Sequence, residues 1–515
     1  MKGTLKFAGA AVLACSVMFC GAAEPVTVRI HDANDNHPVI PREIYGQFAE
    51  HLGTCIYGGL WIGPESPIPN EEGYRTDVFE ALKALEIPVL RWPGGCFADE
   101  YHWMDGIGPR EQRPRMVNTN WGGTVEDNSF GTHEFLNLCE KLGCEPYISG
   151  NVGSGTPEEL AKWVEYMTAE EGPMAKLRKE NGREKPWKVK YIGVGNESWG
   201  CGGNMRAEYY SDLYRRYSTY CRDYGQNRLY KIASGASDYD FNWTETLMKQ
   251  VGNRMHGLSL HYYTIADWNN KGSATEFSDE TYYSTLGKAL EIEPVIRRHK
   301  AIMDSYDPDH RVDLMVDEWG TWFDEEPGTV RGHLFQQNTL RDAMVAALTL
   351  NVFHRHTDRV KMANIAQVVN VLQAMILTRG EEMVLTPTYH LFYMYRVHQG
   401  CEYLPTDCDA GVRKVDHGRT VPEVSVTASR SAEGEIHLSL VNPDLTQNRT
   451  LRIETDRLQP REVSGVILTA DRISDYNDFG QESKVKNRFF DDFKLRKGVI
   501  ELELPAKSIV TLTIR

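Results

Sequence analysis

The chain has 515 residues, with 57 basic and 72 acidic side chains, a formal net charge of −15 and 41% hydrophobic residues. This length predicts about two to four domains, and the ordinary globular composition excludes collagen-like, coiled-coil and disordered classes. The acidic balance argues against nucleic acid as a partner, because phosphate binding requires clustered Lys and Arg.

Residues 1–23 have the pattern of an export signal. Lys2 and Lys6 precede an apolar stretch that ends in three small residues. The stretch is shorter than the roughly 20 residues that a membrane-spanning helix needs, and we expect no spanning segment elsewhere. The letters VLAC, ending at Cys15, also resemble a bacterial lipoprotein box. We therefore predict an exported protein, periplasmic or extracellular, either free or anchored by a lipid on Cys15.

From residue 44 to residue 400 the sequence alternates short apolar strand candidates with amphipathic helical segments. Alternation of this kind predicts a (β/α)8 TIM barrel, with an open doubly wound sheet as the competing architecture. The strand candidates are 44–48, 87–91, 145–149, 189–194, 231–234, 257–261, 312–316 and 360–365. Helical candidates include 132–142, 157–168, 207–223 and 336–351.

From residue 401 to residue 515 the pattern changes. Short β-branched segments are separated by Asn, Asp, Gly and Pro, and helical periodicity disappears, which predicts a jelly-roll-like, all-β sandwich. In the segment 24–43, the strand candidate 26–30 precedes the barrel, and we expect it to pair into the sandwich. The sandwich candidates are 424–428, 435–441, 450–454, 463–469 and 500–504.

Two strand candidates end in carboxylates. Glu197 follows an apolar strand and Asn196, and Glu318 follows another strand and Asp317. These are the fourth and seventh strands of the predicted barrel, whose C-terminal strand ends hold the active site. Glycoside cleavage requires two opposed carboxylates, about 5–5.5 Å apart in a retaining enzyme. Either carboxylate alone could equally be an ordinary ion-paired side chain.

Five sequence blocks carry a resemblance to a known family. They are GQFAEHLG at 46–53, LRWPGG at 90–95 with DGIGP at 105–109, the two glutamate segments, MANIAQVVNV at 362–371, and TPTYH at 386–390. In this order they resemble the α-L-arabinofuranosidases of glycoside hydrolase family 51, over essentially the whole chain after residue 23. The resemblance implies a retaining, exo-acting hydrolase that removes terminal non-reducing α-L-arabinofuranosyl groups from arabinan, arabinoxylan or related molecules. It also implies a homo-oligomer. We expect no cofactor or catalytic metal, because the carboxylate pair supplies both the acid and the nucleophile.

The resemblance assigns the catalytic roles. Glu197 is expected to be the general acid/base and Glu318 the nucleophile. Asn196 would bind the sugar 2-hydroxyl, a contact that strengthens as charge develops. Arg91 would hydrogen-bond the nucleophile and lower its pKa, and Tyr263 would donate a further hydrogen bond to it.

Four further positions match residues that line the furanose pocket in the family. Glu50 and Gln367 can bind sugar hydroxyls. Trp121 and Trp322 match aromatic positions that shape the pocket, although core packing would also explain them.

Cys96 departs from the family pattern, because many members carry Asn there as a sugar ligand. A thiol is a much weaker hydrogen-bond partner. Cys201, four residues after Glu197, lies on another loop at the same end of the barrel, so we hypothesise that Cys96 and Cys201 are neighbours and form a disulfide. Asp99 and the glutamate after it would add two carboxylates near the site. The departure concerns substrate preference more than reaction type.

Two other functions remain open at this point. One is another retaining specificity on the same barrel, such as an endoglucanase or xylosidase. The other is a non-catalytic carbohydrate-binding protein, against which the pair of Glu197 and Glu318 argues, because binding alone does not require both carboxylates.

Overall fold

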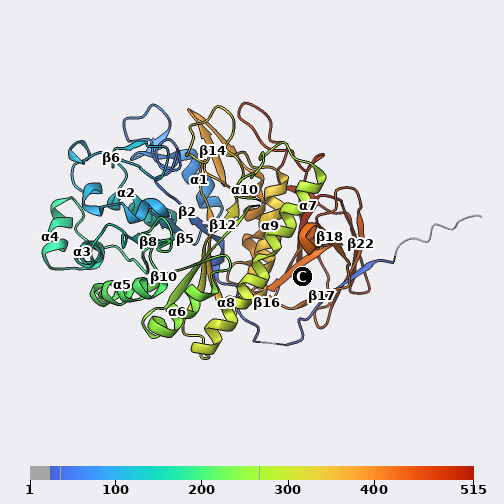
Figure 1. Ribbon diagram of the computed structural model, residues 1–515. Helices are drawn as coiled ribbons and strands as arrows, with labels where there is room; N and C mark the ends of the chain where they lie inside the picture. Colours follow the sequence, from blue (N-terminus) through green and yellow to red (C-terminus); the bar gives the residue numbers. More distant parts are fainter. Residues whose placement is uncertain (1–23, 35, 266) are drawn as a thin grey trace, which may run out of the picture.

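The computed structural model describes residues 24–34, 36–265 and 267–515, so the predicted export signal lies outside the described residues. The chain folds into a barrel and a β-sandwich (Figure 1). Among the described helices, none combines the length and the apolar character that a bilayer crossing requires.

Eight parallel strands close into a barrel in chain order, with the last strand pairing with the first. This closure confirms the (β/α)8 prediction and excludes the open sheet. The strands are β2 (Gly46–Phe48), β5 (Val89–Trp92), β8 (Glu145–Gly150), β9 (Tyr191–Val194), β10 (Tyr230–Ser237), β11 (Gly257–Thr264), β12 (Asp313–Thr321) and β13 (Val360–Ala366).

Helices surround the barrel, and local capping fixes where several of them begin. In α3, the Thr156 hydroxyl accepts a hydrogen bond from the Glu159 amide, and Pro157 occupies the first helical position. The helices are α1 (Thr76–Ala84), α2 (Thr132–Leu142), α3 (Pro157–Thr168), α4 (Pro173–Glu180), α5 (Ala207–Tyr220), α6 (Phe241–Val251), α7 (Asp279–Leu290), α8 (Ile292–Tyr306), α9 (Leu340–Arg355) and α10 (Pro387–Tyr395).

Helix α9 begins four residues later than the predicted segment 336–351. Thr339 and Asp342 form a capping box, which ends the preceding buried loop and starts the helix. Residues 340–354 of α9 are buried on every side, as expected of a helix enclosed by protein. One face packs against the barrel, and the other meets the sandwich, where Asn351 donates to Ser425.

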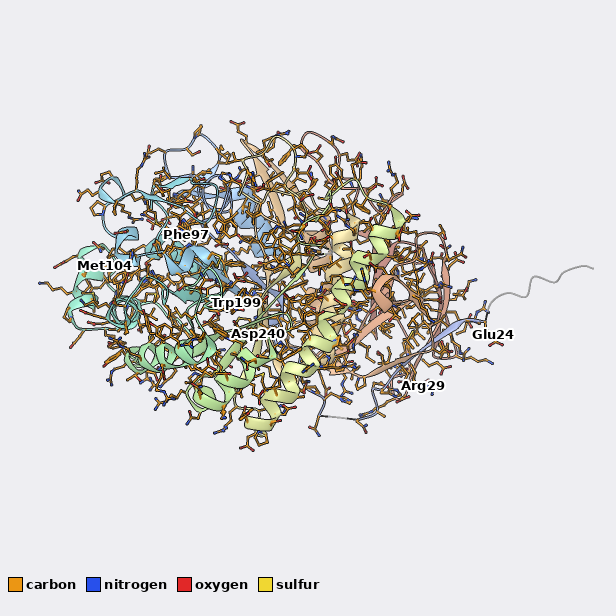
Figure 2. All side chains as sticks on the ribbon, in the orientation of Figure 1. Glu24, Arg29, Phe97, Met104, Trp199 and Asp240 are labelled. Carbon is orange, nitrogen blue, oxygen red and sulfur yellow. A yellow bond between two sulfur atoms is a disulfide. The ribbon has the colours of Figure 1, made fainter. Side chains whose placement is uncertain are left out.

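The sandwich has two sheets, and the N-terminal strand β1 (Val26–Ile30) belongs to one of them. β1 runs parallel to β22 (Arg449–Thr455) and antiparallel to β17 (Thr406–Cys408), which places Val28 and Ile30 in the sandwich core. Glu24 and Arg29 therefore lie at the sandwich end of the molecule, far from Phe97 and Trp199 in the barrel (Figure 2).

The two sheets are built from strands that follow the barrel. Besides β1, the first contains β17 (Thr406–Cys408), β22 (Arg449–Thr455), β26 (Val499–Leu504) and β25 (Phe493–Arg496). The second contains β16 (Glu402–Leu404), β20 (Ser425–Arg430), β21 (Ile436–Asn442), β27 (Ser508–Ile514), β23 (Val463–Thr469) and β24 (Arg488–Phe490).

The packing of β1 can be tested by mutation. Ile30→Ala should lower the free energy of unfolding of the sandwich by about 2–5 kcal/mol, because it removes a fully buried side chain. Arg29→Ala, on the outward face of the same strand, is the control, because its solvent-exposed ion pair with Glu454 adds little to stability. Urea unfolding would measure both variants, and equal losses would contradict the inward orientation of Ile30.

Candidate active site

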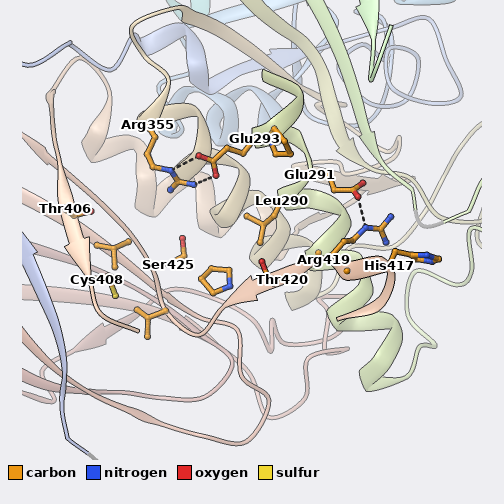
Figure 3. Close-up of a pocket in the computed structure, with 16 residues that line it drawn as sticks. Leu290, Glu291, Glu293, Arg355, Thr406, Cys408, His417, Arg419, Thr420 and Ser425 are labelled. Carbon is orange, nitrogen blue, oxygen red and sulfur yellow. Dashed lines mark hydrogen bonds and ion pairs between the residues drawn. The ribbon is translucent and has the colours of Figure 1, made fainter. Parts of the chain in front are cut away.

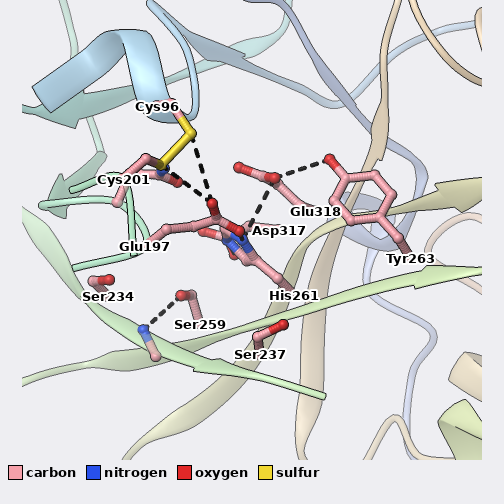
Figure 4. Close-up of polar contacts among 12 residues, drawn as sticks. Cys96, Glu197, Cys201, Ser234, Ser237, Ser259, His261, Tyr263, Asp317 and Glu318 are labelled. Carbon is pink, nitrogen blue, oxygen red and sulfur yellow. Dashed lines mark hydrogen bonds and ion pairs between the residues drawn. A yellow bond between two sulfur atoms is a disulfide. The ribbon is translucent and has the colours of Figure 1, made fainter. Parts of the chain in front are cut away.

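The two predicted carboxylates meet at the C-terminal end of the barrel. Glu197 follows β9 by three residues, and Glu318 lies in β12. Both line a cavity of about 640 Å³. Oxygen atoms of the two carboxylates lie within 4.8 Å of each other, with His261 beside them (Figure 4). This close approach agrees with the spacing of a retaining carboxylate pair.

An irregularity in β12 brings two consecutive acidic side chains to the barrel interior. Two steps along β11, from residue 259 to residue 261, lie opposite three steps along β12, from residue 315 to residue 318. The pairing with β13 shows the same excess in β12. A bulge of this kind interrupts the alternation of side chains. Asp317 and Glu318 therefore both face inward, where a regular strand would send one of them outward.

His261 lies between the acidic side chains and was not among the residues predicted from the sequence. Its Nδ1 lies 2.8 Å from Glu197 Oε1 and 3.4 Å from Glu318 Oε2, and its Nε2 lies 3.1 Å from Asp317 Oδ1. Burial lowers the pKa of His261, but the three carboxylates outweigh this effect and raise the pKa to about 10. The imidazole is therefore a buried cation at neutral pH.

Arg91 is the second buried cation of the site. Its guanidinium donates to Glu318 Oε1 at 2.8 Å and to Asn196 Oδ1 at 2.6 Å, and Tyr263 donates to Glu318 Oε2 at 2.9 Å. Burial and the neighbouring Glu197 raise the pKa of Glu318, whereas His261 and Arg91 oppose that rise. Arg91 thus acts in the predicted direction, but the pKa of Glu318 stays above its ordinary value because burial is the larger effect.

Asp99 positions Asn196 and does not face the substrate cavity as a free carboxylate. It accepts hydrogen bonds from the backbone amides of Val152, Gly153 and Asn196. Burial raises the pKa of Asp99 to about 7, and these hydrogen bonds limit the rise. Asn196 is buried, and its Nδ2 has no hydrogen-bond partner among the described residues. Glu100 instead accepts a hydrogen bond from Thr119.

Glu50 also lines the cavity and is held by two predicted pocket residues. Trp121 Nε1 donates to its Oε1 at 3.0 Å, and Gln367 Nε2 donates to its Oε2 at 2.7 Å. Burial and the charge of Glu318 raise the pKa of Glu50 to about 7. Trp121 is thus a hydrogen-bond donor within the site and not only a packing residue.

The loop that carries Glu197 is tightly folded. Glu197 has a φ of +39°, in the left-handed region that costs a non-glycine residue about 1–2 kcal/mol. Its carbonyl oxygen accepts from the amides of Gly200 and Gly202. A Cβ on Gly202 would lie 1.9 Å from the Asn196 carbonyl oxygen, so only glycine fits there. These contacts hold the carboxyl of Glu197 toward the cavity.

The hypothesised disulfide is present between Cys96, which begins a short 3-10 helix after β5, and Cys201. The two sulfur atoms lie 3.7 Å and 3.3 Å from Glu197 Oε2. A disulfide sulfur carries no hydrogen, so these are contacts and not hydrogen bonds. Cys96 therefore has no thiol with which to bind a sugar hydroxyl, contrary to the prediction of a weak thiol ligand.

Aromatic rings form the outer part of the cavity. Trp322 packs edge-on against Tyr263, with ring centroids 5.2 Å apart, and Trp268 packs against Trp322 at 5.4 Å. Trp268 and Trp199 also line the cavity but were not predicted, because isolated tryptophans in loops carry no periodic signal. Trp268 is 58% exposed and provides a flat surface beyond the carboxylates.

A second cavity, also of about 640 Å³, lies between α7, α8 and the sandwich (Figure 3). Its main charged side chains are paired with each other. Arg355 lies 3.0 Å from Glu293, and Arg419 lies 2.9 Å from Glu291. Neither catalytic candidate lines this cavity, so the chemistry is assigned to the first.

The fold and the paired carboxylates define a glycoside hydrolase. Two family models match the chain, "Alpha-L-arabinofuranosidase 1 domain" at residues 81–280 and "Alpha-L-arabinofuranosidase C-terminal domain" at residues 317–508. A Bacteroides ovatus protein named intracellular exo-alpha-L-arabinofuranosidase is 63% identical, over 98% of each chain. A probable alpha-L-arabinofuranosidase C of Aspergillus niger is 34% identical, over 88% of this chain and 92% of its own.

Solved structures agree with these relatives. The GH51 arabinofuranosidase of Xanthomonas axonopodis pv. citri superposes with a TM-score of 0.93 at 48% identity, over 95% of this chain and all of its own. An alpha-L-arabinofuranosidase of Thermotoga maritima, in a complex with arabinose, gives 0.83 at 28% identity, over 95% of this chain and 99% of its own. The chain belongs to the α-L-arabinofuranosidases of glycoside hydrolase family 51. The endoglucanase, xylosidase and non-catalytic alternatives are not favoured.

The prediction of export was wrong, together with its lipid-anchored variant through Cys15. The relative at 63% identity is named an intracellular enzyme and matches over 98% of its own length, which points away from export. Two lysines followed by apolar and small residues are a short, weakly specific pattern. An apolar N-terminal segment can satisfy that pattern without being a targeting signal.

The charge of His261 should control the ionisation of Glu318. His261→Gln removes a cation that lowers the pKa of Glu318, so that pKa should rise, and the acid limb of kcat/KM should move to higher pH. A shift of about one pH unit would cost about tenfold in activity below the limb. His417→Gln, at an exposed histidine of the sandwich, is the control for general effects. If the acid limb of kcat/KM lies at the same pH in His261→Gln as in the wild type, His261 does not control the ionisation of Glu318.

Proposed function

We propose that the protein releases terminal non-reducing α-L-arabinofuranosyl groups with retention of configuration, Glu318 acting as nucleophile and Glu197 as general acid/base. The observation that carries the two-carboxylate mechanism is the close approach of Glu197 and Glu318, within 4.8 Å, at the C-terminal end of the barrel, and the family resemblance supports which carboxylate takes which role. Membership of family 51 supports the substrate class.

The reaction takes place in two displacements. Glu318 attacks the anomeric carbon while Glu197 gives its proton to the departing glycosidic oxygen, and a covalent arabinosyl–enzyme forms. Glu197 then takes a proton from water, which attacks the same carbon and releases Glu318. Arg91 and Tyr263 hold one oxygen each of Glu318, which orients it for attack.

Neutral polar groups around the carboxylates are suited to sugar hydroxyls. Asn196 offers its unpartnered Nδ2 to the 2-hydroxyl, beside the carbon where positive charge develops. Glu50 and Gln367, hydrogen-bonded to each other, take the other furanose hydroxyls. Cys96 contributes an apolar sulfur surface, so we assign it no hydrogen bond to the sugar.

We further propose that the leaving group is an arabinan or arabinoxylan fragment, bound along the aromatic rings of Trp322 and Trp268. The B. ovatus relative is named an exo-acting enzyme, and a cavity of about 640 Å³ suits a terminal sugar with its neighbour. Homo-oligomerisation, implied by the family resemblance, stays a prediction that sedimentation of the purified protein would test.

Azide should distinguish the two carboxylates. With 4-nitrophenyl α-L-arabinofuranoside, Glu318→Ala should lose about 10⁴-fold or more of kcat, the scale measured for lost nucleophiles. Glu197→Ala should form the arabinosyl–enzyme but hydrolyse it slowly, and azide should restore turnover and yield an arabinosyl azide of retained configuration. An azide product of inverted configuration from Glu197→Ala would reverse the two assignments. Glu100→Gln, outside the catalytic cavity, serves as a control for the loss of an acidic side chain.

The contact of Asn196 with the 2-hydroxyl can be isolated with a modified substrate. Asn196→Ala should lower kcat/KM for the arabinofuranoside by about 10²–10³-fold, since it removes a donor that acts in the transition state. The same variant should change kcat/KM for the 2-deoxy analogue far less, because that substrate lacks the hydroxyl. Equal losses on both substrates would show that Asn196 acts through the position of Glu197 or Arg91 instead.

A further inference from the structure

Three potential metal ligands converge on one side of the acid/base. The sulfur atoms of Cys96 and Cys201 and one carboxylate oxygen of Glu197 all lie within 4.8 Å of one another. They come from two loops, after β5 and after β9, so the barrel itself brings them together. Cys201 is exposed at the rim of the cavity, and Cys96 is partly buried.

The disulfide determines whether these atoms can act as ligands. Disulfide sulfurs are poor donors, whereas two thiolates are the preferred ligands of thiophilic cations. A dithiol reductant opens the bond by thiol–disulfide exchange. It transfers two electrons and two protons to the two protein sulfurs and is itself oxidised to a disulfide. The exposed Cys201 is the sulfur that such a reductant can reach.

We propose that the reduced protein binds one thiophilic divalent cation, of the Zn²⁺ and Cd²⁺ class, through Cys96, Cys201 and Glu197, and that the disulfide prevents this binding. Two protons leave the thiols as the two metal–sulfur bonds form. Three protein ligands leave one tetrahedral position for water. The bound cation occupies Glu197 Oε2, so the glutamate cannot exchange a proton with substrate or water, and hydrolysis stops.

A competing site lies nearby and must be distinguished. Glu197, His261 and Glu318 also hold ligand atoms within 4.8 Å of one another, and they do so whether or not the disulfide is formed. Both ring nitrogens of His261 face carboxylates, and a metal would have to displace its proton. Metal binding at this second group would not depend on reduction of the disulfide, whereas binding at the first group requires it. A comparison of the oxidised and the reduced protein therefore distinguishes the two sites.

Other thiols supply a background that the design must remove. In the part of the chain that the structure describes, six further cysteines are free, among them the neighbouring Cys139 and Cys144. These remain thiols in both the oxidised and the reduced protein, so their contribution cancels in the difference between the two. Cys408, free and partly buried in the sandwich, provides a matched control position.

The test is a Cd²⁺ titration of the full-length protein, oxidised or reduced with a phosphine that is then removed under nitrogen. The reduced protein should gain a cadmium–thiolate charge-transfer absorbance that saturates at one additional equivalent. It should also lose about 10²-fold or more of its arabinofuranosidase activity, recovered on adding a chelator, since acid–base catalysis is worth that much. The oxidised protein should show neither change.

Variants assign the ligands. Cys201→Ser and Cys96→Ser should each abolish the additional absorbance, whereas Cys408→Ser should keep it. The proposal is overturned if reduction adds no absorbance, or if the absorbance survives in Cys201→Ser. Inhibition of the oxidised protein would place the metal at His261 and Glu318 instead, and added absorbance with full activity would exclude Glu197 as a ligand. The absorbance does not depend on the catalytic roles proposed above.

Discussion

A buried balance of charge organises this active site. Arg91 and His261 bring two positive charges into the barrel, and Asp317, Glu318 and Glu197 can bring three negative ones. Unpaired charge in such an environment is costly. The cluster is neutral when one of the three carboxyl groups carries a proton, which is the state that a nucleophile and a proton donor require before reaction. The same electrostatic constraint that stabilises the site therefore also prepares it for catalysis.

Backbone geometry gives the charge balance its positions. The bulge in β12 turns Asp317 inward next to Glu318, and Asp317 can then anchor both cations. Nearby cations lower the pKa of Asp317 despite its burial, so it remains a fixed anion. On the opposite side, the left-handed backbone at Glu197 needs the glycine at position 202 to close its loop. Small local departures from regular structure thus bring together groups that a regular barrel would separate.

These departures explain what the sequence could and could not predict. Alternation of strands and helices predicted all eight barrel strands, and strand-end carboxylates with a family resemblance predicted Glu197 and Glu318. His261 was missed although its strand was predicted, because a single histidine on a buried strand is more often a core residue. The inward turn of Asp317 depends on a bulge, which leaves no local pattern in the residues around it. The export prediction failed because it relied on a short, weakly specific pattern at the N-terminus, without a structural or chemical constraint.

A hairpin of the C-terminal region, β18 (Val412–Lys414) and β19 (Thr420–Pro422), also contributes to the active-site cavity. Arg419 comes well after the last barrel strand in the chain, yet it lines both the catalytic cavity and the second cavity. Its guanidinium is fixed by Glu291 at the end of α7, at 2.9 Å, and Lys288 holds the other oxygen of the same carboxylate. Asp416, in the same hairpin as Arg419, lies 3.6 Å from its guanidinium, so ion pairs hold this side chain from both the hairpin and the end of α7. The C-terminal region therefore does more than stabilise the barrel, because it supplies a fixed cationic side chain to the wall of the catalytic cavity.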